Sequence, residues 1–419
     1  MILCRLAKNA AWIGATQLLN YGLPILTLPV VTRAFGPSLY GTLAAISAYS
    51  AYAGLAVNYG FGYSGPRMVS NLRCDFPELS KEASAIVGAQ IGLSLIAATT
   101  FIALLPFIPY AFAQRTVSVV ILIQFLGNSI APQWLFVGLE RMRDYVLLQS
   151  LFRGVAAGII ISFVRAPSDV FLFVSVNAGA AILNAGCSFL MLTRYGVRWQ
   201  LPGPRAAISA IRGSTSLFLS TLSINFYTTT NVLVVALVLG PAAGGTFGLA
   251  DRLCTVVSGF IGPITTAIYP FICGISSRLE THEEAQTKRL LFRSIVAMSA
   301  LGSMALFCFA PLLVSIAGGD AFDQAVPVLR SMALLPLLGA LSNIFGIQTM
   351  LPSRMDRELN WVVTSAAFIG VAGMFLSCKL IGLQGAGLAV LAVECFVTFS
   401  MAIILQRRIN VMTLFLRPL

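Results

Sequence analysis

Residues 385–405 read GAGLAVLAVECFVTFSMAIIL, and Glu394 is the single charged side chain in this run. A helix of about 20 apolar residues crosses the roughly 30 Å hydrocarbon core of a bilayer, where every backbone polar group must be satisfied within its own segment. Eleven further runs of this kind precede it, separated by short polar connectors. The sequence therefore predicts an all-α polytopic membrane protein with about 12 transmembrane helices. The predicted spans are 9–32, 39–59, 84–105, 116–139, 145–164, 170–192, 215–239, 245–272, 291–317, 326–351, 359–380 and 385–405.

Composition and charge distribution indicate the same class and also an orientation. The chain has 419 residues, of which 58% are hydrophobic and 10% charged, so no large soluble domain fits. With the N-terminus inside, the inner connectors and tails hold twenty lysines and arginines, and the outer connectors hold four. Basic residues favour the cytoplasmic side, so both termini are expected to be cytoplasmic. The net charge of +12 is then mostly this orientation signal, with contacts to anionic membrane lipids, and no nucleic acid partner is expected.

The sequence offers little that would support catalysis. The outer connectors are short, no nucleophile and base stand in a catalytic spacing, and His282 is the single histidine, next to two glutamates in an inner connector. The eight cysteines show neither disulfide nor metal-ligand spacing, and most fall inside predicted spans, where cysteine packs as a small apolar residue. We expect no catalytic residue, no metal and no cofactor.

The chain resembles itself at an offset of 204 residues. After span one, the sequence has Gly36-Pro37, three further residues and Gly41-Thr42. After span seven it has the same pattern, Gly240-Pro241, three further residues and Gly245-Thr246. Each copy has six spans, an even number, so the two halves share one orientation and are related by an axis along the membrane normal. We expect an N-terminal lobe of residues 1–200 with helices 1–6 and a C-terminal lobe of residues 201–419 with helices 7–12, arranged around a central cavity.

Polar side chains recur at helical spacing inside several spans, which marks helix faces turned towards protein or water. Spans one, two, seven and eight each carry such a stripe, and these are the corresponding helices of the two halves. The substrate-binding candidates from these stripes are Gln17, Asn20, Asn58 and Asn225. Spans four and six add Gln124 with Asn128 and Asn177 with Asn184. The alternative for each residue is hydrogen bonding between tightly packed helices.

Charged residues within or at the ends of spans are the sharper signal, because an intramembrane charge is costly and is usually paired or functional. Asp251 and Arg252 are adjacent, so their side chains point about 100° apart on a helix and are poorly placed to neutralise each other. Arg252 is the first candidate for an anionic cargo, because guanidinium suits phosphate, and an ion pair with Glu394 or another acid is the alternative. The further candidates are Arg33, Arg153 and Arg330 for cargo, with snorkelling to the interface as the alternative for the last two, and Glu394 and Asp251 for a coupled ion.

Several motifs along the chain also belong together. They are Arg33-Ala34-Phe35-Gly36-Pro37 with Tyr40-Gly41, Asn58-Tyr59-Gly60-Phe61-Gly62 with Ser64 and Arg67, residues 132–142, residues 247–253, and Gly385-Ala386-Gly387 with Glu394. As a set they resemble the bacterial polysaccharide exporters that flip lipid-linked O-antigen or exopolysaccharide repeat units. Those exporters belong to the multidrug/oligosaccharidyl-lipid/polysaccharide exporter superfamily. The resemblance covers essentially the whole chain, and it departs at Asn58, where the family often has Asp.

The resemblance implies a two-lobed, V-shaped transporter of the bacterial inner membrane. Such a protein moves an undecaprenyl-diphosphate-linked oligosaccharide from the cytoplasmic to the periplasmic leaflet by alternating access, for surface polysaccharide biosynthesis. The expected partners are this substrate, membrane lipids, a polysaccharide polymerase and a chain-length regulator. The main alternative is a multidrug or toxin extrusion antiporter of the same fold. A membrane enzyme and a non-transporting scaffold are the more distant alternatives.

Overall fold

The computed structural model describes residues 2–72, 75–108, 113–262, 264–265, 268–269, 272, 282–407 and 414–415. For residues 2–21, 216, 220, 223, 224 and 226–228 it describes the backbone alone. Regular structure throughout these residues is helical, and eight segments of this part of the chain are long and apolar enough to cross a membrane. The two halves of α1, together with α9 and α10, correspond to the other four predicted spans. The expected all-α polytopic fold is confirmed.

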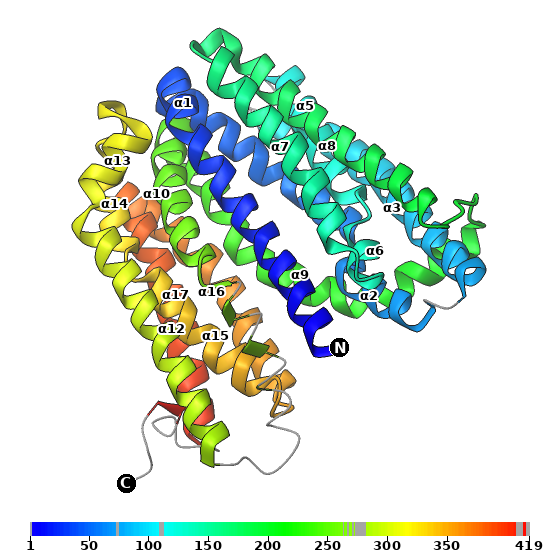
Figure 1. The fold of residues 1–419 in the computed structure, drawn as a ribbon. Coiled ribbons are helices and arrows are strands. Elements are labelled where there is room, and N and C mark those ends of the chain that lie inside the picture. Colours follow the sequence, from blue (N-terminus) through cyan, green and yellow to red (C-terminus); the bar gives the residue numbers. More distant parts are fainter. Residues whose placement is uncertain are drawn as a thin grey trace.

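The first half of the chain forms one bundle, on the upper right of Figure 1. Its helices are α1 (Ile2–Asn58), α2 (Phe61–Leu72), α3 (Phe76–Leu104), α5 (Arg115–Ile130), α6 (Gln133–Gly138), α7 (Met142–Phe163) and α8 (Val170–Arg194), with short 3₁₀ turns at Leu105–Phe107 and Pro167–Asp169. Helix α8 packs against α5 and α7, and both of these pack against α1. We call this bundle the N-lobe.

The second half forms a second bundle, on the lower left of Figure 1. Its helices are α9 (Pro204–Leu239), α10 (Pro241–Gly259), α12 (His282–Cys308), α13 (Ala310–Gly318), α14 (Ala325–Met332), α15 (Leu335–Phe345), α16 (Asp356–Ile381) and α17 (Leu383–Gln406), with a 3₁₀ turn at Asp320–Phe322 and a π-helical turn at Gly346–Met350. We call this bundle the C-lobe, and its largest contact with the N-lobe is between α10 and α1.

The repeated glycine-proline motif makes the same turn in both lobes. Gly36 (φ 65°, ψ 176°) divides α1 into two helices, and Gly240 (φ 94°, ψ 165°) separates α9 from α10. This positive-φ backbone is open to glycine and strained for other residues. Thr42 and Thr246 then make the same contact, since each hydroxyl donates to the carbonyl four residues earlier, at 3.0 Å. The two halves are therefore structural repeats, as the sequence predicts.

The two copies of the motif also pack directly on each other. A Cβ added to Gly41 would overlap the carbonyl oxygen of Pro241, and a Cβ added to Gly245 would overlap that of Pro37. The contact is reciprocal, as expected for repeats related by a two-fold axis. Because neither glycine has a side chain, α1 and α10 approach backbone to backbone at this end of the lobes.

The structure differs from the predicted spans in several places. The fourth and ninth spans are each divided between two helices, the fourth between α5 and α6 and the ninth between α12 and α13. The inner connector after span two contains α2, and α9 begins at Pro204 rather than at Thr215. The start of α9 lies under the N-lobe, where Phe218 stacks on Tyr59 with ring centroids 4.3 Å apart. The tenth span is broken into α14, α15 and the π-helical turn, because Pro336 lacks the N–H that would continue the helix. Apolar runs predict where the chain crosses the membrane but not these interruptions.

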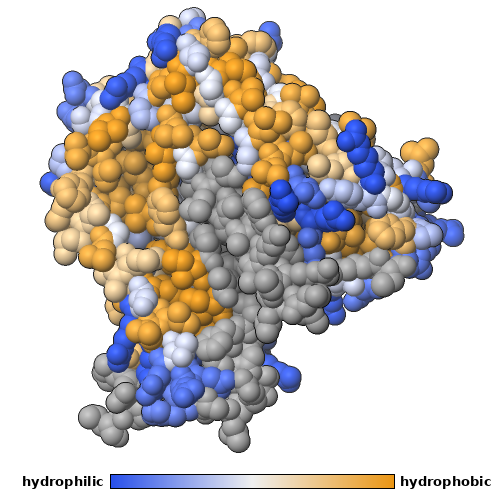
Figure 2. All heavy atoms as spheres, viewed as in Figure 1, coloured by the Kyte–Doolittle hydropathy of each residue, from blue (hydrophilic) through white to orange (hydrophobic). Residues whose placement is uncertain are grey.

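The apolar residues divide between the interior and the lipid-facing surface. Each lobe has two buried clusters, which contain Phe101 and Phe136 in the N-lobe and Phe292 and Phe322 in the C-lobe. Large apolar side chains on α3, α8, α12 and α16 are exposed instead. Figure 2 shows hydrophobic residues over the middle of the molecule and hydrophilic residues towards its ends. This distribution suits a protein surrounded by lipid, where burial is not required of an apolar side chain.

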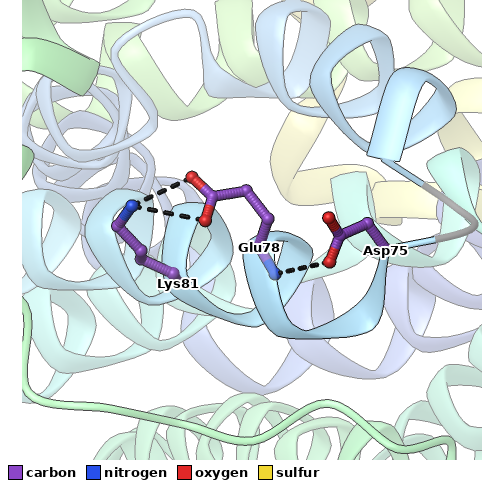
Figure 3. A network of polar contacts seen from close by, with 3 residues as sticks. All are labelled: Asp75, Glu78 and Lys81. Carbon is purple, nitrogen blue, oxygen red and sulfur yellow. Dashed lines mark hydrogen bonds and ion pairs between the residues drawn. The ribbon is translucent and has the colours of Figure 1, made fainter.

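Charged residues at the start of α3 mark one polar end of the N-lobe. The Asp75 carboxylate accepts a hydrogen bond from the Glu78 backbone N–H at 3.1 Å and so caps the helix (Figure 3). Lys81 donates to the Glu78 carboxylate at 2.9 Å, and both side chains are exposed. The exposed pair contributes little stability. It keeps this end of the helix polar.

Candidate functional site

Helix α10 separates two cavities and presents one charge to each. Arg252 lines a cavity of about 480 Å³ whose other walls are N-lobe helices. Asp251, the preceding residue, lines a cavity of about 250 Å³ inside the C-lobe. Consecutive residues on a helix point about 100° apart, which places the two side chains in different compartments. We call these the N-lobe cavity and the C-lobe cavity.

The N-lobe cavity combines two guanidinium groups with several side-chain amides. Arg153 on α7 lines it together with Arg252, and the two cations are near enough to repel each other. Further polar lining residues come from the two halves of α1, from α5 and from α8, and are Thr27, Tyr40, Ser47, Gln124, Asn128, Asn177 and Asn184. Guanidinium carries donors and a permanent positive charge, and amides both donate and accept. This chemistry suits an anion attached to a hydroxyl-rich group.

The C-lobe cavity is smaller and acidic. Asp251 and Glu394 both line it, with Asn231, Thr255 and Ser258 as further polar groups. The Glu394 carboxylate accepts a hydrogen bond from the Ser342 hydroxyl at 2.9 Å. Among the described residues, no ion pair joins Glu394 to Arg252, so the paired alternative for Arg252 is absent there. Two carboxyl groups with neutral oxygen neighbours suit a proton or a small cation.

Arg33 makes a contact between the lobes rather than lining either cavity. Its guanidinium donates to the carbonyl oxygens of Ser315 at 3.4 Å and Ile316 at 3.2 Å, in the last turn of α13. The neighbouring Thr32 hydroxyl donates to the Ala317 carbonyl. A cation at the C-terminus of a helix is favoured by the helix dipole and by the unsatisfied carbonyls there. Arg33 therefore joins α1 to the C-lobe.

The remaining predicted residues lie elsewhere. Arg330 is exposed, with its guanidinium 5.8 Å from the centre of the Phe307 ring. Asn58 is exposed and accepts a hydrogen bond from the Gly62 N–H at 3.1 Å, in the turn between α1 and α2. Asn225 is half-buried and donates to the Thr221 carbonyl at 2.9 Å. The side chains of Gln17 and Asn20 lie outside the described residues. Substrate roles for these five residues stay predictions.

The sequence detects the amides of α5 and α8 as polar stripes but does not place them in the site. Gln124 with Asn128, and Asn177 with Asn184, are spaced four and seven residues apart, so each pair lies on one helix face. The packing of α5 against α8 brings the two pairs to the same cavity as Arg153. The spacing in the sequence identifies each pair of amides as one helix face. Only the fold shows that α5 and α8 bring the two pairs together. In the described chain, no group of three or more potential metal ligands occurs.

These observations define the class of protein: a polytopic transporter with two repeated lobes and cavities of opposite charge. A family model described as "Polysaccharide biosynthesis protein" matches residues 6–276, and the chain belongs to this family. The chain is 28% identical over 403 residues to the "Putative O-antigen transporter" of Escherichia coli K12, covering 94% of this chain and 95% of that protein. It is 23% identical over 218 residues to the "Lipopolysaccharide biosynthesis protein WzxC" of the same organism, covering 51% and 44%.

A solved structure shares the fold. It is described as the inward-facing conformation of a multidrug resistance MATE family transporter of the MOP superfamily. The TM-score is 0.69, with 15% sequence identity over 94% of both chains. At this identity the likeness concerns the fold alone. It agrees with the two-lobed helical architecture expected from the sequence.

Proposed function

We propose that this protein flips a lipid-linked oligosaccharide, an undecaprenyl-diphosphate-linked repeat unit, from the cytoplasmic to the periplasmic leaflet of the bacterial inner membrane. The observation that carries the proposal is the N-lobe cavity, where Arg153 and Arg252 share one space with four side-chain amides. The similarity to O-antigen transporters supports the same substrate class. Both termini are cytoplasmic in this proposal, in accord with the distribution of basic residues.

The cavity matches the head group of such a lipid part by part. A diphosphate carries negative charge and acceptor oxygens, which Arg153 and Arg252 would bind with charge-assisted hydrogen bonds. Sugar hydroxyls both donate and accept, as amides do. The polyprenyl tail needs no polar site and would remain in lipid beside the lobes. A substrate with these three parts accounts for both the arginines and the amides.

The contact between the glycine motifs supports alternating access in this proposal. Gly41 and Gly245 bring α1 and α10 together at the outer ends of the lobes, and Arg33 adds a second link to α13. The substrate would load from the cytoplasmic leaflet while these contacts hold, and leave after they part. We take the lobes as residues 1–200 and 201–419, with the start of α9 resting under the N-lobe.

The C-lobe cavity supplies the candidate for ion coupling. Asp251 and Glu394 would exchange a proton or a sodium ion during the cycle, since both line this space. Export of negative charge also gains about 2.3 kcal/mol per charge for each 100 mV of inside-negative potential. A polysaccharide polymerase and a chain-length regulator are the proposed downstream partners, because the flipped unit is a building block for surface polysaccharide.

A multidrug antiporter is the second candidate, and the acidic C-lobe cavity is the observation that favours it. Organic cations are attracted by carboxylates, and Asp251 and Glu394 provide two. The N-lobe cavity argues against this function, because two guanidinium groups repel a cationic drug. Dye efflux that is lost in Glu394→Gln and kept in Arg252→Ala would support the antiporter instead.

The test is flipping of a fluorescent polyprenyl-diphosphate disaccharide in proteoliposomes, measured as protection from an impermeant quencher. We expect Arg153→Gln and Arg252→Gln each to slow flipping about tenfold, because each removes a charged hydrogen bond to phosphate. Arg205→Gln, at an exposed position in the first turn of α9, is the matched control and should flip at the wild-type rate. Unchanged flipping by the Arg153→Gln/Arg252→Gln double variant would refute the proposal.

A further inference from the structure

One oxygen atom on the wall of the N-lobe cavity has no hydrogen-bond partner. Asn184 on α8 lines this cavity, its side chain is 4% exposed, and its Oδ1 atom accepts no hydrogen bond. A carbonyl oxygen can only accept, and leaving a buried one unsatisfied costs about 1–3 kcal/mol. Most buried polar atoms in folded proteins have a partner in the protein, in ordered water or in a ligand, so each exception calls for an explanation. Here the position in a cavity points to a donor on a ligand.

Asn184 lies beside a buried tyrosine on the neighbouring helix. Tyr145 on α7 is buried, and its side chain lies close to the side chains of both Asn184 and Arg153, which is eight residues further along α7. Asn184 and Arg153 both line the N-lobe cavity. The orphan oxygen and the guanidinium therefore belong to neighbouring side chains on one wall.

A second amide continues this wall along α8. Asn177 lies seven residues before Asn184, which is two helical turns, so both face the same side. The Asn177 nitrogen donates to the Phe173 carbonyl at 2.8 Å, which directs the amide along its own helix. Both asparagines line the cavity, and Asn128 on the neighbouring α5 lines it too. The wall is thus a row of amides that ends beside a permanent cation.

We propose that this α7–α8 wall is a sugar subsite, in which the sugar bonded to the diphosphate donates a hydroxyl or amide hydrogen to Asn184 Oδ1. The inference rests on the proposed function, since Arg153 and Arg252 would hold the diphosphate next to it. In a lipid-linked oligosaccharide the first sugar is covalently attached to the phosphate. A site for one must therefore lie beside a site for the other, as the amide row and Arg153 do. Asn184 is then a residue that determines sugar specificity.

Water is the competing occupant of this site. A water molecule could donate to Asn184 Oδ1 equally well, and then the amide row would serve only to keep the cavity hydrated. The two cases differ in what the sugar adds to binding. If water satisfies the oxygen, a diphosphate with a sugar and one without should respond equally to a change at Asn184.

The experiment measures binding of four probes to the purified full-length protein in lipid nanodiscs. They are farnesyl diphosphate and its conjugates with glucose, galactose and N-acetylglucosamine, each bonded through the terminal phosphate. We expect at least one conjugate to bind wild-type protein about tenfold more tightly than farnesyl diphosphate, the size of one or two neutral hydrogen bonds. Asn184→Leu should abolish this ratio and leave the dissociation constant of farnesyl diphosphate within about twofold.

Three variants separate the subsite from general effects on folding. Tyr145→Phe removes the tyrosine hydroxyl and keeps the Asn184 oxygen, so the sugar-dependent ratio should remain. Asn360→Leu removes an amide that does not line the cavity, at an exposed position near the start of α16, and it should behave as wild type. Asn184→Ala repeats the test with a smaller side chain if the leucine variant has a lowered melting temperature.

The outcomes distinguish this inference from the function on which it rests. A ratio that persists in both Asn184 variants overturns the sugar subsite and leaves the proposed function intact. The same holds if no conjugate binds wild-type protein more tightly than farnesyl diphosphate. If farnesyl diphosphate itself does not bind, or binds Arg153→Gln and Arg252→Gln equally well, the proposed function fails and the subsite fails with it.

Discussion

The N-lobe cavity and the C-lobe cavity differ in size and in the sign of their charge, although they belong to repeated halves of one chain. The first has about 480 Å³ and two arginines, and the second has about 250 Å³ and two acidic residues. At the 204-residue offset, Asp251 and Arg252 correspond to Ser47 and Ala48, which carry no charge. A symmetrical framework can therefore hold asymmetrical chemistry. In this chain, two adjacent residues of one helix, Asp251 and Arg252, supply one charge to each compartment.

Reversing the charge at one of these adjacent positions gives the largest expected effect. Arg252→Glu should weaken binding of farnesyl diphosphate at least 100-fold, about 3 kcal/mol, because an attractive contact becomes a repulsive one. Asp251→Asn, one residue away, should leave the same dissociation constant unchanged, because its side chain lies in the other cavity. Isothermal titration calorimetry of both variants checks this. Equal losses would mean that the two cavities act as one.

The C-lobe cavity is tested by removing a carboxylate charge without changing its shape. Glu394→Gln should slow flipping driven by an imposed ion gradient about tenfold, within the usual range of coupling between sites. Diphosphate binding should remain at the wild-type level, since Glu394 does not line the N-lobe cavity. The control is Glu283→Gln, at an exposed position in the first turn of α12. A loss of diphosphate binding in Glu394→Gln would contradict the division of roles.

The smallest effect is expected at Arg33. The Arg33 variant tests whether this arginine binds substrate together with Arg153 and Arg252. Arg33→Ala removes hydrogen bonds to the carbonyls of Ser315 and Ile316, so the flipping rate should change about threefold as the link between the lobes weakens. The dissociation constant of farnesyl diphosphate should stay constant. If it rises as much as in Arg252→Gln, Arg33 belongs to the substrate site after all, as the sequence predicts.

Some of this organisation can be read from the sequence because it depends on neighbours along the chain. Apolar run length predicts the spans, and helix geometry predicts that Asp251 and Arg252 diverge. The matching turns at Gly36 and Gly240 are equally local. All three follow from residues a few positions apart.

Other features depend on residues hundreds of positions apart and needed the fold. Arg33 reaches the end of α13, which no local pattern indicates. Arg153 lies in the cavity rather than at the lipid interface, because α1 and α8 both pack against its helix. The packing of α5 against α8 gathers the four amides into one wall. The sequence supplies the polar groups, and only the packing decides which of them meet.

The two cavity arginines belong to different lobes, and this bears on how a cargo would be released. Arg153 belongs to α7 of the N-lobe and Arg252 to α10 of the C-lobe, so an anion bound between them would be held by both lobes at once. A rotation that parts the lobes would separate the two cations and weaken their shared contacts with the anion. Without an anion the two like charges would repel each other. The movement that opens the cavity between the lobes would therefore also release the bound anion.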